Sequence, residues 1–157
     1  MLAATKVIFA DHQQFYIYDA GYEHFADPAL DWQKAPRLAH GYLASERAVY
    51  VSTVAPLHSH RVRVYLDQAP TLAYERVFTA QIAIGSGSLV ISAPANESED
   101  DLIIPLPPAR YRLRICANSV GIDEMHVEPD RNDPMEDEEL AQRDDIEYYD
   151  LFLERAA

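Results

Sequence analysis

Short runs in which apolar residues recur at every second position extend along most of this chain. Their apolar members are mainly β-branched or aromatic, and a period of two places them on one face of an extended backbone. The pattern predicts half-buried β-strands rather than amphipathic helices. The clearest runs contain Phe15 and Ile17; Val49 and Val51; Val62, Val64 and Leu66; and Val77, Ala80, Ile82 and Ile84.

Proline and glycine separate these runs. Pairs such as Asp27–Pro28 and Ala69–Pro70 favour turns, because proline fixes φ and lacks a backbone donor. The sequence Gly85–Ser86–Gly87 predicts a hairpin that joins strands at residues 74–84 and 88–92. Further strands are predicted at residues 5–10, 13–19, 47–54, 60–67, 101–105, 110–118 and 146–154.

Short, mainly antiparallel strands with turns at intervals of about 8–12 residues are typical of β-sandwiches and barrels. We predict an all-β, antiparallel β-sandwich with a short acidic helix near the C-terminus. The last strand alternates strictly, so that one of its faces is apolar at three positions in four. That face consists of Glu147, Tyr149, Leu151 and Leu153.

The size of the chain suits one domain. Its 157 residues, 48% of them hydrophobic, can bury an ordinary core without disulfide or metal support, so we expect one domain over 1–157 with an acidic insertion at about 120–145. Cys116 is the single cysteine, which excludes an intrachain disulfide and favours a reducing compartment. The first ten residues do not form a secretory signal, and no segment is long enough to span a membrane. We therefore expect a cytoplasmic protein with no membrane partner.

Negative charge is concentrated near the C-terminus. Residues 123–157 contain 14 carboxylates and 3 arginines, a net charge of −11 out of −13 for the whole chain. A field of this sign attracts basic proteins and repels nucleic acids. The charge pattern therefore predicts a basic protein partner and no nucleic acid.

Two segments interrupt the strand pattern. In the acidic segment, Asp133 is a candidate N-cap, Pro134 suits the first helical position and Glu136 occupies the capping-box position. These residues predict a short helix that continues to about Arg143. Residues 32–41 fit either a short helix after Asp31 or an irregular turn, because Pro36 falls too late for a first-turn proline.

Catalytic and metal-binding patterns are weak. His58 and His60 share one face of a predicted strand, but no further ligands complete a zinc site. The acidic run 130–137 has Met135 where a calcium loop of the EF-hand type needs glycine. Cys116 has Arg112 and Arg114 on its strand face but no base, and no pair of carboxylates is marked out for glycoside chemistry. We expect neither an enzyme nor a cofactor.

The acidic segment is instead the candidate binding surface. Successive carboxylates on an extended backbone, which rises about 3.3 Å per residue, match the spacing of about 3.4 Å between phosphates along one DNA strand. Tyr148 adds an aromatic side chain of a type that is frequent in interface hot spots. A solvated surface without a partner remains the simplest alternative. The predicted contact residues are Glu128, Asp130, Asp133, Glu136, Asp137, Glu138, Glu139, Asp144, Asp145, Glu147 and Tyr148.

Several motifs resemble the competence protein J family over residues 10–117. They are His12–Tyr18, Asp31–Trp32, Gly41–Tyr42 before the strand 48–53, and Ile104–Pro107 before Tyr111. The family includes the inhibitor of a DNA-entry nuclease, a small acidic all-β protein, so the resemblance implies the same fold and a nuclease partner. Ala109 stands where a turn glycine is expected, and the acidic segment 120–145 is longer than in the family.

Together these features predict a binding protein that inhibits, or gives immunity against, a nuclease or another basic toxin domain. The alternative is a β-sandwich module that binds a small molecule or glycan, with tyrosines and Trp32 along a concave face.

Overall fold

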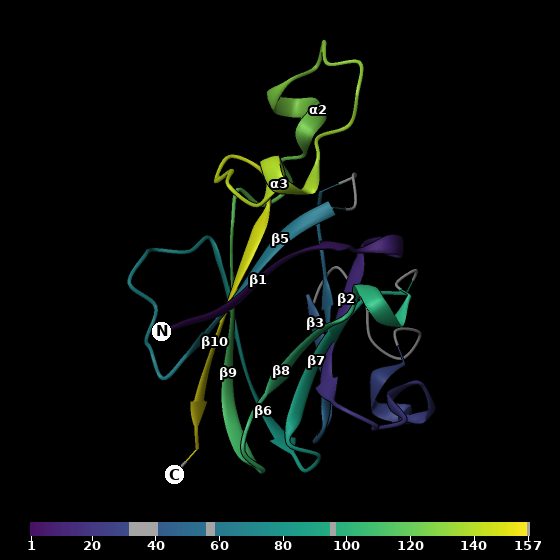
Figure 1. Ribbon diagram of the computed structural model, residues 1–157, viewed down its shortest axis with the longest axis vertical. Coiled ribbons are helices and arrows are strands. Elements are labelled where there is room, and N and C mark those ends of the chain that lie inside the picture. The colour runs from purple at the N-terminus through teal and green to yellow at the C-terminus, as the bar shows by residue number, and fades with distance from the viewer. Residues whose placement is uncertain (32–40, 56–58, 95–96, 157) are drawn as a thin grey trace.

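Ten strands form two five-stranded sheets in this computed structural model, which describes residues 1–31, 41–55, 59–94 and 97–156. The sheets face each other, which confirms the predicted β-sandwich (Figure 1). The strands are β1 (Leu2–Phe9), β2 (Gln14–Asp19), β3 (Tyr42–Ala44), β4 (Ala48–Ser52), β5 (Ser59–Leu66), β6 (Arg76–Ile84), β7 (Ser88–Ser92), β8 (Leu102–Pro105), β9 (Ala109–Asn118) and β10 (Tyr148–Arg155).

Short helices lie outside the sheets. Among the described residues, four are single 3₁₀ turns, and two are four-residue α-helices in the acidic segment. They are η1 (Asp11–Gln13), η2 (His24–Ala26), η3 (Pro28–Leu30), η4 (Ser98–Asp100), α2 (Glu124–Val127) and α3 (Asp137–Leu140). The helix or turn predicted over residues 32–41 falls almost entirely outside the described residues.

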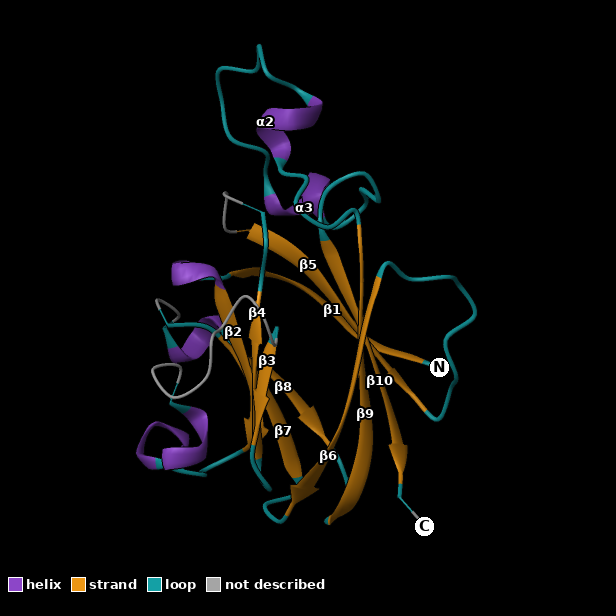
Figure 2. Cartoon of the chain, turned by 180° about the vertical axis from the view of Figure 1, so that it is seen from behind, coloured by secondary structure: helices purple, strands orange, loops and turns teal. Residues whose placement is uncertain are grey.

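The first sheet has the strand order β1-β5-β10-β9-β6, and the second has β3-β4-β2-β7-β8 (Figure 2). All neighbouring strands pair antiparallel except β5 and β10, which are parallel. Each predicted strand is present within a few residues of its expected bounds, whereas the short edge strand β3 was not predicted. Ala109 is extended at the start of β9, opposite Ile84, so its backbone adopts no turn.

The core lies between the sheets and follows the alternation in the sequence. Tyr149, Leu151 and Leu153 of β10 point inward and are almost completely buried. The Tyr149 ring meets Phe15 of the opposite sheet edge-on, with 5.1 Å between ring centroids. Each large apolar side chain buried in this way contributes roughly 1.5–3 kcal/mol to folding.

The connection Gly85–Ser86–Gly87 is not the predicted hairpin, because it carries the chain from β6 in the first sheet to β7 in the second. The buried Asp19 carboxylate holds this crossing. It accepts hydrogen bonds from the amides of Gly85 (3.0 Å) and Ser86 (3.0 Å), from the Ser86 hydroxyl (2.6 Å) and from Arg47. In a hairpin, the backbone amides of the turn would hydrogen bond within the paired strands. Here the carboxylate of Asp19, at the end of β2, accepts the amides of Gly85 and Ser86 instead.

The acidic segment folds as a separate projection, which we call the cap and define as residues 121–146. The cap rises above one end of the sandwich, close to the start of β5 (Figure 1). Its helices correct the prediction, because α3 begins at Asp137 with Glu136 as N-cap and ends at Leu140. Asp133 and Pro134 belong to the preceding irregular segment, where Pro134 lines the surface between α2 and α3.

Candidate functional site

Glu147, the residue before β10, ties the cap to the sandwich. Its carboxylate accepts hydrogen bonds from the amides of Val54 (3.1 Å), Ala55 (3.0 Å) and Gly121 (2.7 Å) and from the Tyr149 hydroxyl (2.8 Å). The side chain is fully buried, so its prediction as a partner contact is wrong. The alternation that turns Tyr149 inward turns Glu147 inward as well, and this signal was present in the sequence.

Tyr148 is the second predicted contact residue that the structure buries. The Arg61 guanidinium lies over its ring, 4.2 Å from the centroid, and 5% of the residue is exposed. Arg61 also donates to the carbonyl of Arg143 (3.0 Å) and to the carboxylate of Asp144 (2.8 Å). Tyr148 therefore supports the base of the cap, and Asp144 is the member of this group that faces solvent.

A small apolar cluster stabilises the cap from inside. Met135, Leu140 and Ile146 are buried together, and Val7 of β1 and Val127 of α2 pack against them. Val7 belongs to the sandwich, so the cluster also joins the cap to the edge of the first sheet. This burial explains why so acidic a segment has a defined fold, since charge alone would favour an extended, solvated chain.

Two arginines neutralise part of the charge of the cap. Arg131 donates to Glu128 (2.8 Å) and, through two nitrogens, to Glu139 (2.9 and 3.0 Å). Arg143 donates to Asp145 (2.9 and 2.7 Å) and also lies near Glu128 and Glu139. The hydrogen bond from Arg131 lowers the pKa of Glu128, and those from Arg143 lower the pKa of Asp145. Three predicted contact residues are therefore engaged within the cap.

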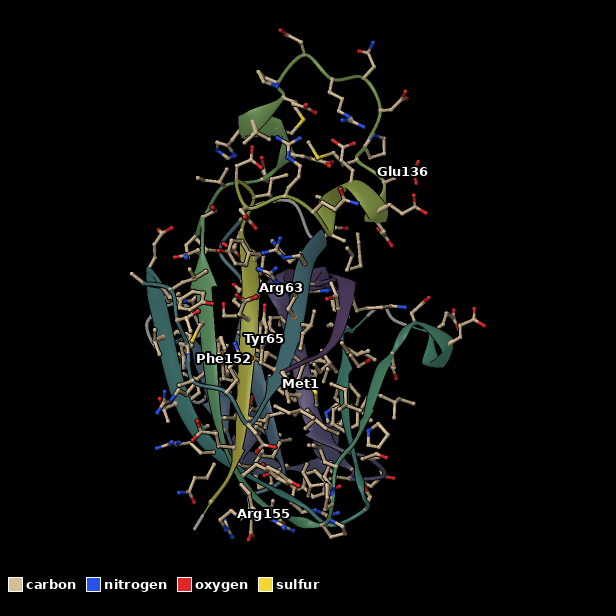
Figure 3. All side chains as sticks on the ribbon, turned by 60° about the vertical axis from the view of Figure 1, so that its left-hand side comes forward. Met1, Arg63, Tyr65, Glu136, Phe152 and Arg155 are labelled. Atoms are coloured by element: carbon tan, nitrogen blue, oxygen red, sulfur yellow. The ribbon has the colours of Figure 1, made fainter. Side chains whose placement is uncertain are left out.

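The remaining predicted residues form the accessible part of the site. Their side chains are exposed, and they take part in no ion pair within the part of the chain that the structure describes. Glu136 extends away from α3 into solvent (Figure 3). These accessible carboxylates are Asp130, Asp133, Glu136, Asp137 and Glu138.

The first helix of the cap, α2, was not predicted from the sequence. Asp123 caps α2 by accepting the amide of His126 (3.1 Å), and the His126 ring accepts the amide of Asp123 (3.2 Å). Burial alone would raise the pKa of Asp123, but its hydrogen bonds with His126 outweigh that effect and lower it. The usual capping-box residue at this position is Glu or Gln, so Asp-x-x-His is a weak signal.

Burial also affects the candidate nucleophile Cys116 and the candidate metal ligand His60. Cys116 is free and buried, and burial raises the pKa of its thiol to about 11. The His60 ring lies inside the sandwich, with Nδ1 at 3.0 Å from the Glu147 carbonyl, whereas His58 lies outside the described residues. Within those residues no group of three or more His, Cys, Asp or Glu side chains could hold a metal ion, and no helix is long and apolar enough to cross a membrane.

The tyrosines do not line one concave face. Tyr16 and Tyr50 are buried beneath η2 on the outside of the second sheet, whereas Tyr65 stacks on Phe152 outside the first, with 4.9 Å between centroids (Figure 3). Phe25 in η2 is three-quarters exposed and borders a hollow of about 230 Å³. Trp32 lies outside the described residues. A small-ligand site would therefore rest on the surface around Phe25.

Two solved structures share the fold over nearly their whole length. ComJ from Bacillus subtilis, the inhibitor of the DNA degrading activity of NucA, superposes with a TM-score of 0.69 and 14% identity over 99% of this chain and 98% of ComJ. Crocagin biosynthetic gene J has a TM-score of 0.58 and 20% identity over 97% and 96%. The sequence matches no protein-family model and no curated protein. The chain thus has a ComJ-like fold, as the sequence resemblance implied.

Proposed function

We propose that this protein binds and inhibits a nuclease, or neutralises another basic toxin domain, through the exposed carboxylates of the cap. The observation that carries the proposal is the ComJ-like fold over 99% of the chain, since ComJ inhibits a nuclease. The proposed setting is the cytoplasm, and the proposed architecture is one domain that bears the cap as an insertion.

The geometry of the cap supports this function. Glu136, Asp137 and Glu138 follow one another at the start of α3, where no arginine of the described chain pairs with them. They concentrate negative charge on a projection at one end of the molecule (Figure 1). A nuclease groove that binds phosphates carries the opposite charge, so the two surfaces attract each other and associate faster at low ionic strength.

The first test is capture from a lysate of the source organism. The bait is the wild-type chain or the double variant Asp137→Asn/Glu138→Gln, which removes two exposed charges. The matched control is Glu97→Gln/Glu99→Gln, which removes two exposed charges, one just before η4 and one within it, away from the cap. Captured protein is purified, and its nuclease activity is measured with and without each variant.

The proposal predicts that the wild type and the control capture and inhibit one basic nuclease, while the cap variant does so more weakly. Equal inhibition by all three proteins would place the interface elsewhere on the sandwich. A captured protein whose activity is unchanged by the wild-type chain would contradict inhibition itself.

A second candidate function is the binding of a small molecule or glycan. The hollow of about 230 Å³ beside Phe25, which Tyr18 and Tyr22 also line, is the observation in its favour. Salt separates the two functions. A charge-steered protein complex associates more slowly as ionic strength rises, whereas binding at an aromatic surface changes little.

A further inference from the structure

A hollow of about 170 Å³ lies at the junction of the cap and the sandwich. One wall comes from the end of β1 and the start of β5, and the other comes from the cap. The side chains that line the hollow include those of Phe9, Asp123, Glu124, Met135, Leu140 and Ile146.

Most of the side chains that line the hollow are apolar. Met135, Leu140 and Ile146 belong to the buried cluster of the cap, so their positions are set by packing rather than by exposed loops. Phe9 is about half exposed at the end of β1. A long aliphatic chain that entered the hollow would therefore contact side chains that are already ordered.

The charged side chains that line the hollow, Asp123 and Glu124, are both acidic. Asp123 is buried and caps α2, which leaves its carboxylate ionised at neutral pH. Glu124 accepts the amide of Met135 through Oε2 (3.0 Å), and no described residue hydrogen bonds to Oε1. None of the described side chains that line the hollow is Lys or Arg.

We propose that this hollow binds a lysine or arginine side chain of the basic protein partner, with the cation at Glu124. This inference rests on the proposed function and adds the residue class that the partner inserts. Lysine and arginine combine an aliphatic stem with a charged end, which matches an apolar hollow that carries a carboxylate. An apolar side chain would desolvate Glu124 without compensation, and an acidic one would be repelled.

The hollow and the exposed carboxylates have different roles in this scheme. Glu136, Asp137 and Glu138 are solvated, so they mainly accelerate encounter. A side chain enclosed by Met135 and Leu140 is desolvated in the complex, and such central contacts determine how slowly a complex dissociates.

The test uses n-butylammonium, followed by NMR of the backbone amides in the full chain. n-Butanol has the same stem without charge, and methylammonium has the charge without the stem. The proposal predicts saturable shifts at Ser59, Leu140 and Ile146 that are strongest for n-butylammonium. Glu124→Gln keeps an acceptor for the Met135 amide and should weaken n-butylammonium binding roughly two- to fivefold, while Glu99→Gln, at an exposed position in η4, should not.

The proposal is overturned if the shifts map to residues 136–138 instead, if n-butanol binds as well as n-butylammonium, or if Glu124→Gln binds like the wild type. The comparison of ligands needs no substitution, so it holds even if Glu124→Gln misfolds. Failure here is separate from failure of the proposed function. If the wild type and Glu124→Gln inhibit the nuclease equally, only the proposed role of the hollow is contradicted. If the hollow binds n-butylammonium but the protein inhibits no nuclease, only the proposed inhibitor function is contradicted.

Discussion

The Glu147 carboxylate accepts the amide of Gly121 at 2.7 Å, across the two ends of the cap. The Glu147 amide donates in turn to the carbonyl of Ile122 at 2.8 Å. Glu147 thus joins the two ends of the cap through both its side chain and its backbone. Because the same carboxylate also accepts the amides of Val54 and Ala55, the cap has a defined position on the sandwich.

Replacing Glu147 with Gln should destabilise the protein by about 1–3 kcal/mol. The amide group of glutamine has only one acceptor oxygen, so its NH₂ would face backbone donors that are buried. Urea unfolding followed by circular dichroism measures the loss. Glu138→Gln removes the same charge at an exposed position and should change stability by less than about 0.5 kcal/mol. Equal midpoints for the two variants would show that Glu147 does not hold the cap.

Gly41 and Gly21 offer a matched pair of backbone tests. Both have positive φ, +77° and +80°, so alanine at either position should cost roughly 1–2 kcal/mol through the backbone. At Gly41 the new Cβ would also collide with the side chains of Phe78 and Arg76, whereas at Gly21 no described heavy atom lies within 4 Å. Gly41→Ala should therefore lose more unfolding free energy in urea than Gly21→Ala. Similar losses would mean that Phe78 moves aside freely.

Cys116 should resist thiol reagents in the folded protein. Burial, together with the charge of Asp150, raises the pKa of the thiol to about 11, so little thiolate exists at pH 8. Relative to an ordinary thiol, the thiolate fraction falls on the order of 100-fold. Reaction with dithiobis(nitrobenzoate) should be slow until guanidinium chloride is added. The exposed variant Gln142→Cys provides one fast thiol as a control, and fast reaction of both thiols would contradict the buried site.

His24 should make the stability of the protein pH-dependent. Burial lowers the pKa of its imidazole, while Glu23 and Asp101 oppose this effect, and Nδ1 lies 2.7 Å from the Tyr50 hydroxyl. In the unfolded chain the His24 imidazole is protonated as the pH falls through about 6.5, whereas in the folded chain protonation requires a lower pH. The free energy of unfolding therefore falls as the pH drops below about 6.5.

Unfolding free energies at pH 7.5 and 5.5 measure this loss. The non-titrating variant His24→Gln should lose less stability over the same interval than the wild type. NMR of the imidazole provides a direct check, and a midpoint at or above that of free histidine would reverse the predicted sign.

The strands were predictable because their signal is local. Val62, Val64 and Leu66 alternate with polar residues and therefore lie on the buried side of their strand. Burial of this side drives the packing of the sheets, so the sequence pattern and the fold have the same physical cause. The prediction of a hairpin at Gly85–Gly87 was wrong because the local sequence of a tight turn is the same whether the two strands pair with each other or belong to different sheets. The deciding contact comes from Asp19, which is distant in sequence.

The candidate site was predictable only as a region. Composition located the charge, but it does not show which carboxylates already have partners. Arg131 and Arg143 select Glu128, Glu139 and Asp145 through tertiary contacts, and those contacts leave Glu136–Glu138 accessible. The helix was placed too early because Asp133 and Pro134 satisfy local start rules, whereas burial of Leu140 sets where α3 forms.

The position of β10 has a consequence for how the chain folds during synthesis. β10 lies between β5 and β9, so the first sheet remains in two unconnected parts until residues 148–155 have left the ribosome. A nascent chain therefore exposes two long, unpaired strand edges, which are prone to intermolecular pairing. The carboxylates of residues 123–145 emerge just before β10, and their mutual repulsion would keep neighbouring nascent chains apart during that interval.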